Sequence, residues 1–209
     1  MDRRILLVGL FSFLLVGAVA AGVLLFSRSE GFRGTGYAEP YPPAAEIELV
    51  RSNGDSFRLS ELRGNVVLLF FGYTSCPDVC PTTMAELKQA LEKLSEEDAS
   101  QVQVLFVTVD PERDTPERVQ QYVDHFNPDF IGLSGTEAEL AGVWRDYGVF
   151  RAIVDGTSAA GYLVDHTARV TVIDEEGQLR LSYPFDTPVD NIVHDLKLLL
   201  REKRQNASR

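Results

Sequence analysis

The feature that most constrains the fold is an apolar run at residues 66–71, which leads directly toward the only two cysteines of the chain. Its β-branched and aromatic residues are typical of a strand buried on both faces. From Thr82 onward, apolar residues recur at the spacing of one helix face. Cys76 and Cys80 therefore lie where a buried strand passes into a helix N-terminus, a position that favours thiolate over thiol. This arrangement predicts a dithiol site for a soft metal ion or for redox exchange.

The rest of the chain alternates predicted strands and helices. Asn53 and Gly54 lie between short apolar segments at 47–50 and 57–59, which predicts a hairpin. Further strands are predicted at 102–109, 130–133, 161–164, 168–173 and 179–183, and helices at 82–95, 115–126, 136–147 and 187–203. This order predicts an α/β, thioredoxin-like fold with a central mixed sheet flanked by helices. Right-handed crossovers would bring the ends of the first two long strands to one edge, near the dithiol.

The N-terminal segment predicts export. Residues 5–26 contain no charged side chain and would span about 33 Å as a helix, enough to cross a bilayer. The flanking arginines favour a cytoplasmic N-terminus at 1–4, with the domain on the periplasmic side of the cell membrane. A cleaved signal peptide is the alternative, because residues 18–20 fit an A-x-A site, and it also exports the domain. We expect a single-pass transmembrane helix at 5–26, a Gly/Pro-rich linker at 27–45, the domain at 46–203 and a tail at 204–209.

The charge of the chain excludes one class of partner. The formal net charge is −11, whereas a surface that binds nucleic acid is basic. Two cysteines in an exported chain usually indicate a structural disulfide. Here they are so close in sequence that the loop they close would be tiny and its entropic stabilisation small.

The cysteine spacing suits two thiolates that face one ion, and thiolates are soft ligands that favour Cu(I). A third ligand would complete such a site, and the chain has three histidines. His125 and His194 lie in predicted helices and are interpreted as ordinary surface or boundary residues. His166 is predicted in a short loop between two strands that the sheet can bring over the dithiol. It is therefore either a ligand or an ordinary loop histidine.

One absence bears on redox chemistry. Thioredoxin-like oxidoreductases have a cis-proline that faces their C-x-x-C pair, just before a late strand. Here no proline occurs between Gly148 and Ser182, and the comparable loop holds His166. Both the longer cysteine spacing and this histidine alter the usual thiol-exchange geometry.

Two acidic positions lie near the predicted site. Asp110 ends a strand at the same edge, where it would tune the site or steer a partner. Alternatively, the segment 110–116 only forms a turn and caps the next helix, because Thr115-Pro116 is a typical helix start. Asp78, between the cysteines, either influences the thiolates or is a solvated turn residue.

Three segments, at 70–81, 109–116 and 164–167, resemble the Sco/SenC family of membrane-anchored copper chaperones for cytochrome c oxidase assembly. The resemblance covers the chain from about residue 46. It implies that Cys76, Cys80 and His166 bind one copper ion per domain, as Cu(I) or Cu(II). It also implies delivery to the binuclear copper centre of cytochrome c oxidase subunit II, with an upstream copper donor or thiol reductant as a further partner.

The expected function is therefore that of a copper chaperone without catalytic turnover. The first alternative is a thiol–disulfide reductase in which Cys76 and Cys80 form the redox-active pair and keep the cysteines of that centre reduced. The second is a peroxidase with one of these cysteines as the peroxidatic thiol. The third is a domain in which the two cysteines form only a structural disulfide.

Overall fold

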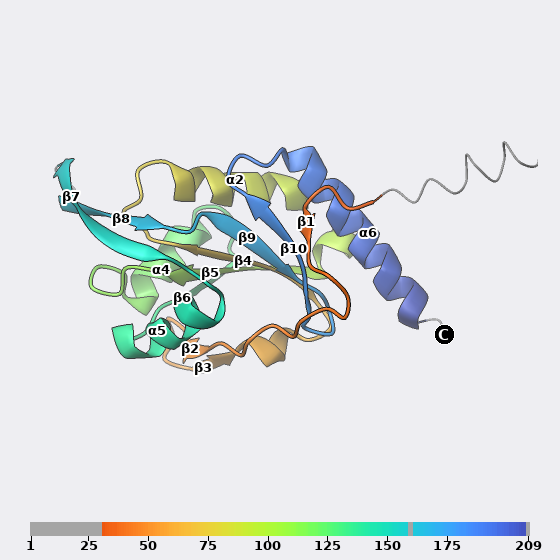
Figure 1. The fold of residues 1–209 in the computed structure, drawn as a ribbon, viewed down its shortest axis with the longest axis horizontal. Coiled ribbons are helices and arrows are strands. Elements are labelled where there is room, and N and C mark those ends of the chain that lie inside the picture. Colours follow the sequence, from red (N-terminus) through yellow and green to blue (C-terminus); the bar gives the residue numbers. More distant parts are fainter. Residues whose placement is uncertain (1–30, 159–160, 208–209) are drawn as a thin grey trace, which may run out of the picture. The chain divides into compact units, whose positions relative to one another are not determined.

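The computed structural model describes residues 31–158 and 161–207, and its centre is a six-stranded mixed sheet (Figure 1). The strands, in spatial order, are β1 (Thr35–Gly36), β10 (Leu179–Pro184), β9 (Arg169–Ile173), β4 (Val66–Gly72), β5 (Val102–Thr108) and β6 (Ile131–Leu133). Strand β4 pairs in parallel with β5, as β5 does with β6, and the other neighbours are antiparallel. The predicted α/β thioredoxin-like fold is confirmed.

Helices cover both faces of this sheet. They are α2 (Val79–Glu92), α3 (Glu96–Ala99), α4 (Pro116–Asp124), α5 (Glu137–Asp146) and α6 (Val189–Ala207), with a short 3-10 turn, η1, at Leu59–Leu62. Figure 1 shows α2 and α6 above the sheet and α5 below it. Two adjacent aromatic residues of β4 point to opposite faces of the sheet. Phe70 contacts Phe106, which contacts Tyr122 of α4, whereas Phe71 contacts Tyr147 after α5.

Strand β4 forms the middle of the core, because all seven of its residues are buried. Its last residue, Gly72, allows the first turn of α2 to approach closely. A Cβ at this position would lie 2.9 Å from the Sγ of Cys80 and 2.9 Å from the ring of Phe106. A side chain at residue 72 would therefore displace the second cysteine.

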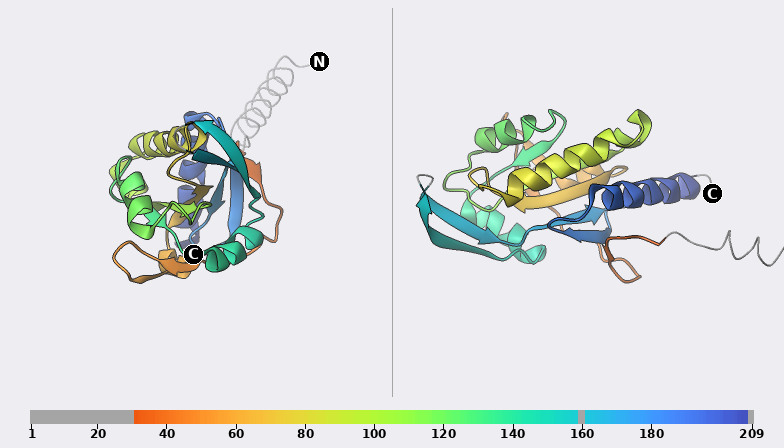
Figure 2. Two further views of the ribbon diagram at one scale, coloured as in Figure 1. Left: turned by 90° about the vertical axis from the view of Figure 1, so that its left-hand side faces the viewer. Right: turned by 90° about the horizontal axis from the view of Figure 1, so that it is seen from above.

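Two hairpins supplement the sheet. The predicted N-terminal hairpin is confirmed as β2 (Glu48–Val50) and β3 (Ser56–Arg58). The other pairs β8 (Gly161–His166) with β7 (Arg151–Ser158), a strand that the sequence analysis does not predict. Figures 1 and 2 show this hairpin extending beyond the helices. Because β8 continues to residue 166, His166 ends a strand opposite Arg151, and its predicted position in a loop is wrong.

The structure also changes the start of the folded domain. Residues from Phe32 onward belong to it, including most of the predicted linker. The backbone N–H groups of Arg33 and Gly34 donate hydrogen bonds to the buried carboxylate of Asp195 in α6, at 2.8–3.0 Å. Strand β1 then pairs with β10. At the other end, α6 continues to Ala207 and includes part of the predicted tail.

Within the residues that the structure describes, no helix combines the length and the apolar character needed to cross a membrane. The predicted span at 5–26 lies outside the described residues, as does the predicted N-terminus at 1–4.

The Asp195 carboxylate is expected to hold the start of the domain in place. Asp195→Asn replaces one acceptor oxygen by a donor that faces backbone donors, so we expect a loss of about 1.5–3 kcal/mol in the free energy of unfolding. Urea unfolding measures this loss, and hydrogen exchange at residues 33–36 should accelerate. Asp190→Asn is the matched control, because its exposed ion pair with Lys93 contributes little. Equal stability of the two variants would contradict the assigned role of Asp195.

Candidate metal centre

Three potential metal ligands from two distant parts of the chain converge at the end of the sheet. The Sγ atoms of Cys76 and Cys80 and a ring nitrogen of His166 all lie within 4.8 Å of one another. The Cys80 Sγ and the His166 Nε2 are 3.5 Å apart. Both cysteines are free thiols. The structure thus brings together the three residues that the sequence analysis singled out, and this is the only such group among the described His, Cys, Asp and Glu side chains.

The first turn of α2 positions the two sulfurs. The helix begins at Val79, three residues before the predicted start, so Cys80 lies inside it. Pro81 is accommodated because residues in the first turn need no intrahelical N–H bond. For the same reason the N–H of Cys80 is available, and it donates to the Sγ of Cys76 at 3.4 Å. The helix N-terminus therefore stabilises a negative charge on Cys76.

The two thiols differ in protonation. Hydrogen bonding from the Cys80 thiol, followed by that from His166, lowers the pKa of Cys76 to about 4 even though partial burial opposes the shift. Burial, together with the neighbouring Cys76 thiolate, raises the pKa of Cys80. Cys76 is the more accessible of the two, since Cys80 is fully buried. The site therefore offers one accessible thiolate, at Cys76, and one buried thiol, at Cys80. The buried thiol is expected to give up its proton only when its sulfur bonds to a metal ion or to an electrophile.

The imidazole of His166 is held between aromatic side chains. Its ring lies edge-on to Tyr73 and Phe70, with centroid distances of 5.8 and 6.3 Å. Its Nδ1 lies 3.2 Å from the carbonyl oxygen of Thr167. When a metal ion replaces the Nε2 proton that faces the sulfurs, a proton on Nδ1 would donate to this carbonyl, which is the tautomer suited to a metal ligand.

A depression of about 210 Å³ gives access to two of the three potential ligands, Cys76 and His166. Apolar side chains form much of its lining, namely Pro77, Val79, Leu163, Val164 and Ala168. Asp78 and Asp165 also border it, and both are exposed. Asp78 is thus a solvated residue at the rim, where it adds negative charge next to the thiols.

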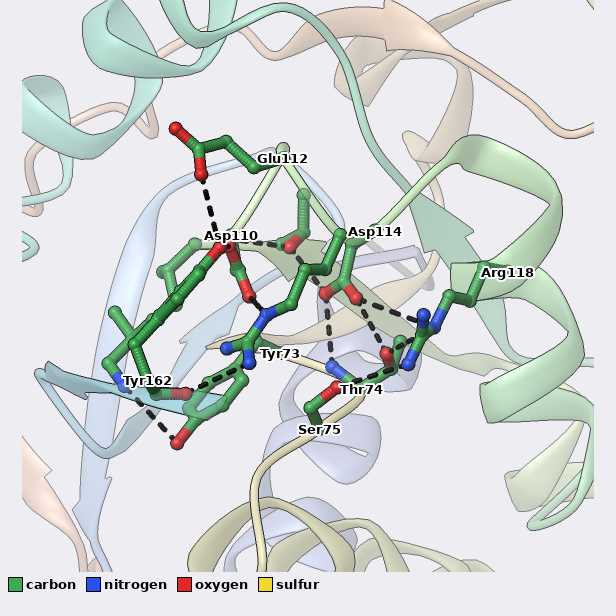
Figure 3. A network of polar contacts seen from close by, with 12 residues as sticks. Tyr73, Thr74, Ser75, Asp110, Glu112, Asp114, Arg118 and Tyr162 are labelled. Atoms are coloured by element: carbon green, nitrogen blue, oxygen red, sulfur yellow. Dashed lines mark hydrogen bonds and ion pairs between the residues drawn. The ribbon is translucent and has the colours of Figure 1, made fainter. Parts of the chain in front are cut away.

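The turn after β5 both starts helix α4 and binds the loop that precedes the cysteines. Thr115 caps α4 by accepting from the N–H of Arg118, and Pro116 follows it, as the sequence predicts. In addition, the turn holds the loop before the cysteines. The buried Asp114 accepts hydrogen bonds from the N–H and the Oγ1 of Thr74, at 3.0 and 2.6 Å (Figure 3).

Arg118 completes this contact, because it donates to Thr74 and to Ser75, at 2.9 and 3.0 Å. Burial raises the pKa of the Asp114 carboxyl, while the bonds from Thr74 and Thr108 oppose the shift. Nothing in the local sequence pattern shows that Asp114 and Arg118 reach the cysteine loop, so this role is not predictable from the sequence.

The other two histidines lie elsewhere. His125 is exposed at the end of α4, with its Nδ1 near the carbonyl of Gln121. His194 in α6 contacts the carboxylate of Asp195 at 2.8 Å. Neither belongs to the group of potential ligands in the described part of the chain.

Comparisons with known proteins agree on one family. The family model described as SCO1/SenC matches residues 37–201. An SCO2-like protein of Rickettsia felis is 36% identical over 189 residues, which cover 88% of this chain and 92% of the relative. The solution structure of apo Sco1 from Thermus thermophilus is 43% identical, covers 81% of this chain and 97% of its own, and superimposes with a TM-score of 0.73. The structure of Bradyrhizobium japonicum ScoI with copper bound is 36% identical, covers 75% of this chain and 99% of its own, and has a TM-score of 0.67.

The difference in protonation between Cys76 and Cys80 predicts a difference in their reactivity toward alkylating reagents. Because a group with a pKa of about 4 is ionised throughout the range from about pH 6 to 8, iodoacetamide should modify Cys76 at a nearly constant rate there. Cys80 should react far more slowly, as mass spectrometry after digestion would measure. Cys80→Ala removes the main hydrogen-bond donor and should slow the reaction of Cys76 at pH 6. A rate in the parent that rises about tenfold per pH unit, as for an ordinary thiol, would contradict this assignment.

Proposed function

Because the chain belongs to the SCO1/SenC family, we propose that it is a copper-binding chaperone for the assembly of cytochrome c oxidase. The observation that carries the proposal is the convergence of the Sγ atoms of Cys76 and Cys80 with a nitrogen of His166 within 4.8 Å. A chaperone releases its copper to a partner, so the ion is cargo and the protein needs no catalytic turnover.

The donor set fits copper in both of its biological oxidation states. Two thiolates are soft ligands suited to Cu(I), and an imidazole nitrogen also suits Cu(II). Binding requires deprotonated sulfurs, and the pKa of Cys76 near 4 means that one thiolate exists before any ion arrives. Cys80 would lose its proton on binding. A disulfide between Cys76 and Cys80 would remove both thiolates and should abolish retention of the ion.

The access route is consistent with transfer to a protein. The depression leads to Cys76 and His166, whereas Cys80 is buried behind them. A ligand from the recipient can therefore approach from the Cys76 side and replace the donors one at a time. We propose the binuclear copper centre of cytochrome c oxidase subunit II as the recipient. An upstream copper donor or thiol reductant would have to prepare the site.

We also propose that the chain is anchored in the cell membrane by residues 5–26, with the domain on the extracytoplasmic side. The support is the uncharged sequence of this segment and the arginines that precede it. With the domain starting at Phe32, only a few residues would separate it from the membrane surface.

Thiol–disulfide reduction is the second candidate, because the two thiols are unequal in accessibility and in pKa. In this reaction the Cys76 thiolate attacks a partner disulfide, forms a mixed disulfide and releases one partner thiolate. The sulfur of Cys80 then attacks Cys76, and its proton goes to solvent. The partner leaves with both thiols reduced, and the chain retains a Cys76–Cys80 disulfide. Two electrons pass to the partner in each cycle.

Copper loading tests the proposed ligands. The reduced domain should bind one Cu(I) tightly, and Cys76→Ser or Cys80→Ser should weaken binding by several orders of magnitude, because a hydroxyl is a poor ligand for Cu(I). Competition with a Cu(I) chelator measures the affinities. His125→Ala is the matched control for His166→Ala, since His125 lies outside the site. One copper retained with equal affinity in both cysteine variants would refute the assignment.

His166→Ala distinguishes the two candidate functions. The imidazole serves metal binding, whereas the exchange of disulfides needs only the two sulfurs. For a chaperone, we expect the variant to lose Cu(II) binding and copper transfer to the recipient domain. For a reductase, it should keep most of its rate of reduction of the oxidised recipient, as a thiol assay would show. Full copper transfer by the variant would exclude His166 from the chaperone function.

A further inference from the structure

The turn between β5 and α4 contains two buried carboxylates, of which one binds the cysteine loop and the other binds β8 (Figure 3). Asp114 binds Thr74, two residues before Cys76. Asp110 instead binds Tyr162 of β8, four residues before His166. One turn thus contacts both the loop with the thiols and the strand with the imidazole.

The contacts on the histidine side form a compact cluster of Asp110, Arg113 and Tyr162, here called the Asp110 cluster. The hydroxyl of Tyr162 donates to Asp110 at 2.7 Å, and the Nε of Arg113 donates to the same carboxylate. A second guanidinium nitrogen donates to the carbonyl oxygen of Tyr162 at 2.9 Å. The guanidinium also lies 3.8 Å from the centre of the Tyr162 ring.

The cluster is rigid for physical reasons. Asp110 is fully buried, and the Arg113 side chain is only 18% exposed, so their ion pair lies largely out of contact with water. The planar guanidinium makes hydrogen bonds and a ring contact at the same time, which limits its orientation. The backbone and side chain of Tyr162 are therefore both held to the turn.

His166 needs such support because β7 and β8 form a two-stranded sheet of their own, apart from the six-stranded sheet. After His166 the chain soon enters β9 of the main sheet at Arg169. Before His166, the strand is held by the Asp110 cluster and by Val164, whose N–H donates to the hydroxyl of Tyr73 at 3.3 Å. Tyr73 also lies edge-on to the imidazole. Loss of the cluster would leave this part of β8 held by the Val164–Tyr73 bond and by its pairing with β7, in which Arg151 donates to the carbonyl oxygen of Val109 at 2.8 Å.

We propose that Asp110, Arg113 and Tyr162 are positioning residues that hold the His166 imidazole over the two thiols and so determine how tightly the site retains Cu(II). This inference rests on the proposed function and deepens it. Cu(I) can be held by the two thiolates, whose loop is supported separately by Asp114. Cu(II) depends more strongly on the nitrogen ligand. The cluster should therefore affect the two oxidation states unequally.

Two substitutions of Tyr162 test the cluster by removing different numbers of its contacts. Tyr162→Phe removes only the hydroxyl bonded to Asp110, and Tyr162→Leu also removes the ring that lies against Arg113. We expect Cu(II) affinity to fall by about 10- to 100-fold, the range usual for residues that orient metal ligands. At a fixed Cu(II) concentration, the Cu(II)–thiolate charge-transfer absorption should weaken, in the direction of its loss in His166→Ala. The Cu(I) affinity of both variants should stay within a factor of about 3 of the parent value, which is small compared with the expected loss of Cu(II) affinity.

A matched control is available in Tyr41→Phe. It also removes a tyrosine hydroxyl that donates to a carboxylate, that of Glu39, and neither residue belongs to the group of potential ligands. It should leave both affinities and the absorption spectrum unchanged. A general loss of stability on removal of such a bond would instead appear in both Tyr→Phe variants.

Hydrogen exchange of the metal-free, reduced protein supplies a readout that does not depend on copper. Exchange should accelerate at residues 161–166 in both Tyr162 variants and stay unchanged at 74–80. Thr74→Val, which removes a bond to Asp114, should show the reverse pattern. This comparison tests whether the turn supports the two sides of the site independently.

The outcomes separate this inference from the proposed function. Unchanged exchange at 161–166, or equal losses of Cu(I) and Cu(II) affinity, would overturn the positioning role. Cu(II) binding that is the same in the parent and in His166→Ala would overturn the proposed ligand set, and with it the claim about Cu(II). The expected pattern is selective loss of Cu(II) together with faster exchange of β8.

Discussion

The metal centre depends first on the parallel pairing of β4 with β5, in which Val66 lies beside Val102 and Gly72 beside Thr108. Because both strands end at one edge of the sheet, the loop with the cysteines and the turn with Asp110 and Asp114 emerge next to each other. The buried carboxylates then connect this turn to the cysteine loop and to β8. Apolar side chains on both faces of β4 stabilise the pairing, so the position of the site follows from the core.

The two thiols share one site but occupy different environments, and this difference allows one dithiol to suit two kinds of chemistry. The Cys76 sulfur is partly accessible and accepts an N–H bond from the first turn of α2. The Cys80 sulfur is buried below the end of β4, close to Gly72 and Phe106. An accessible thiolate with a buried partner suits disulfide exchange. The nearby imidazole adds the nitrogen ligand that favours metal binding, and this is why we place copper binding first.

Much of the fold was predictable because its long elements have strong periodicity. The strand at 66–71, the helix caps at Thr115 and Thr136 and the final amphipathic helix all follow from local patterns. Strand β7 was missed although residues 149–154 are mostly apolar, because Arg151 interrupts the run and the pairing comes from its partner β8. The early start of the domain was missed for a similar reason, since a Gly/Pro-rich segment is held by Asp195, more than 160 positions away.

The sequence by itself determined that Cys76 and Cys80 share a site, because four positions across a strand-to-helix junction leave them close in any fold with these elements. It also singled out His166 by its place before a late strand. Only the tertiary structure decided that this imidazole lies 3.5 Å from a sulfur 86 positions away. The same holds for the unequal pKa values of the thiols and for the cluster around Asp110. Burial and long-range hydrogen bonds produce these properties, and both arise only when distant segments pack together.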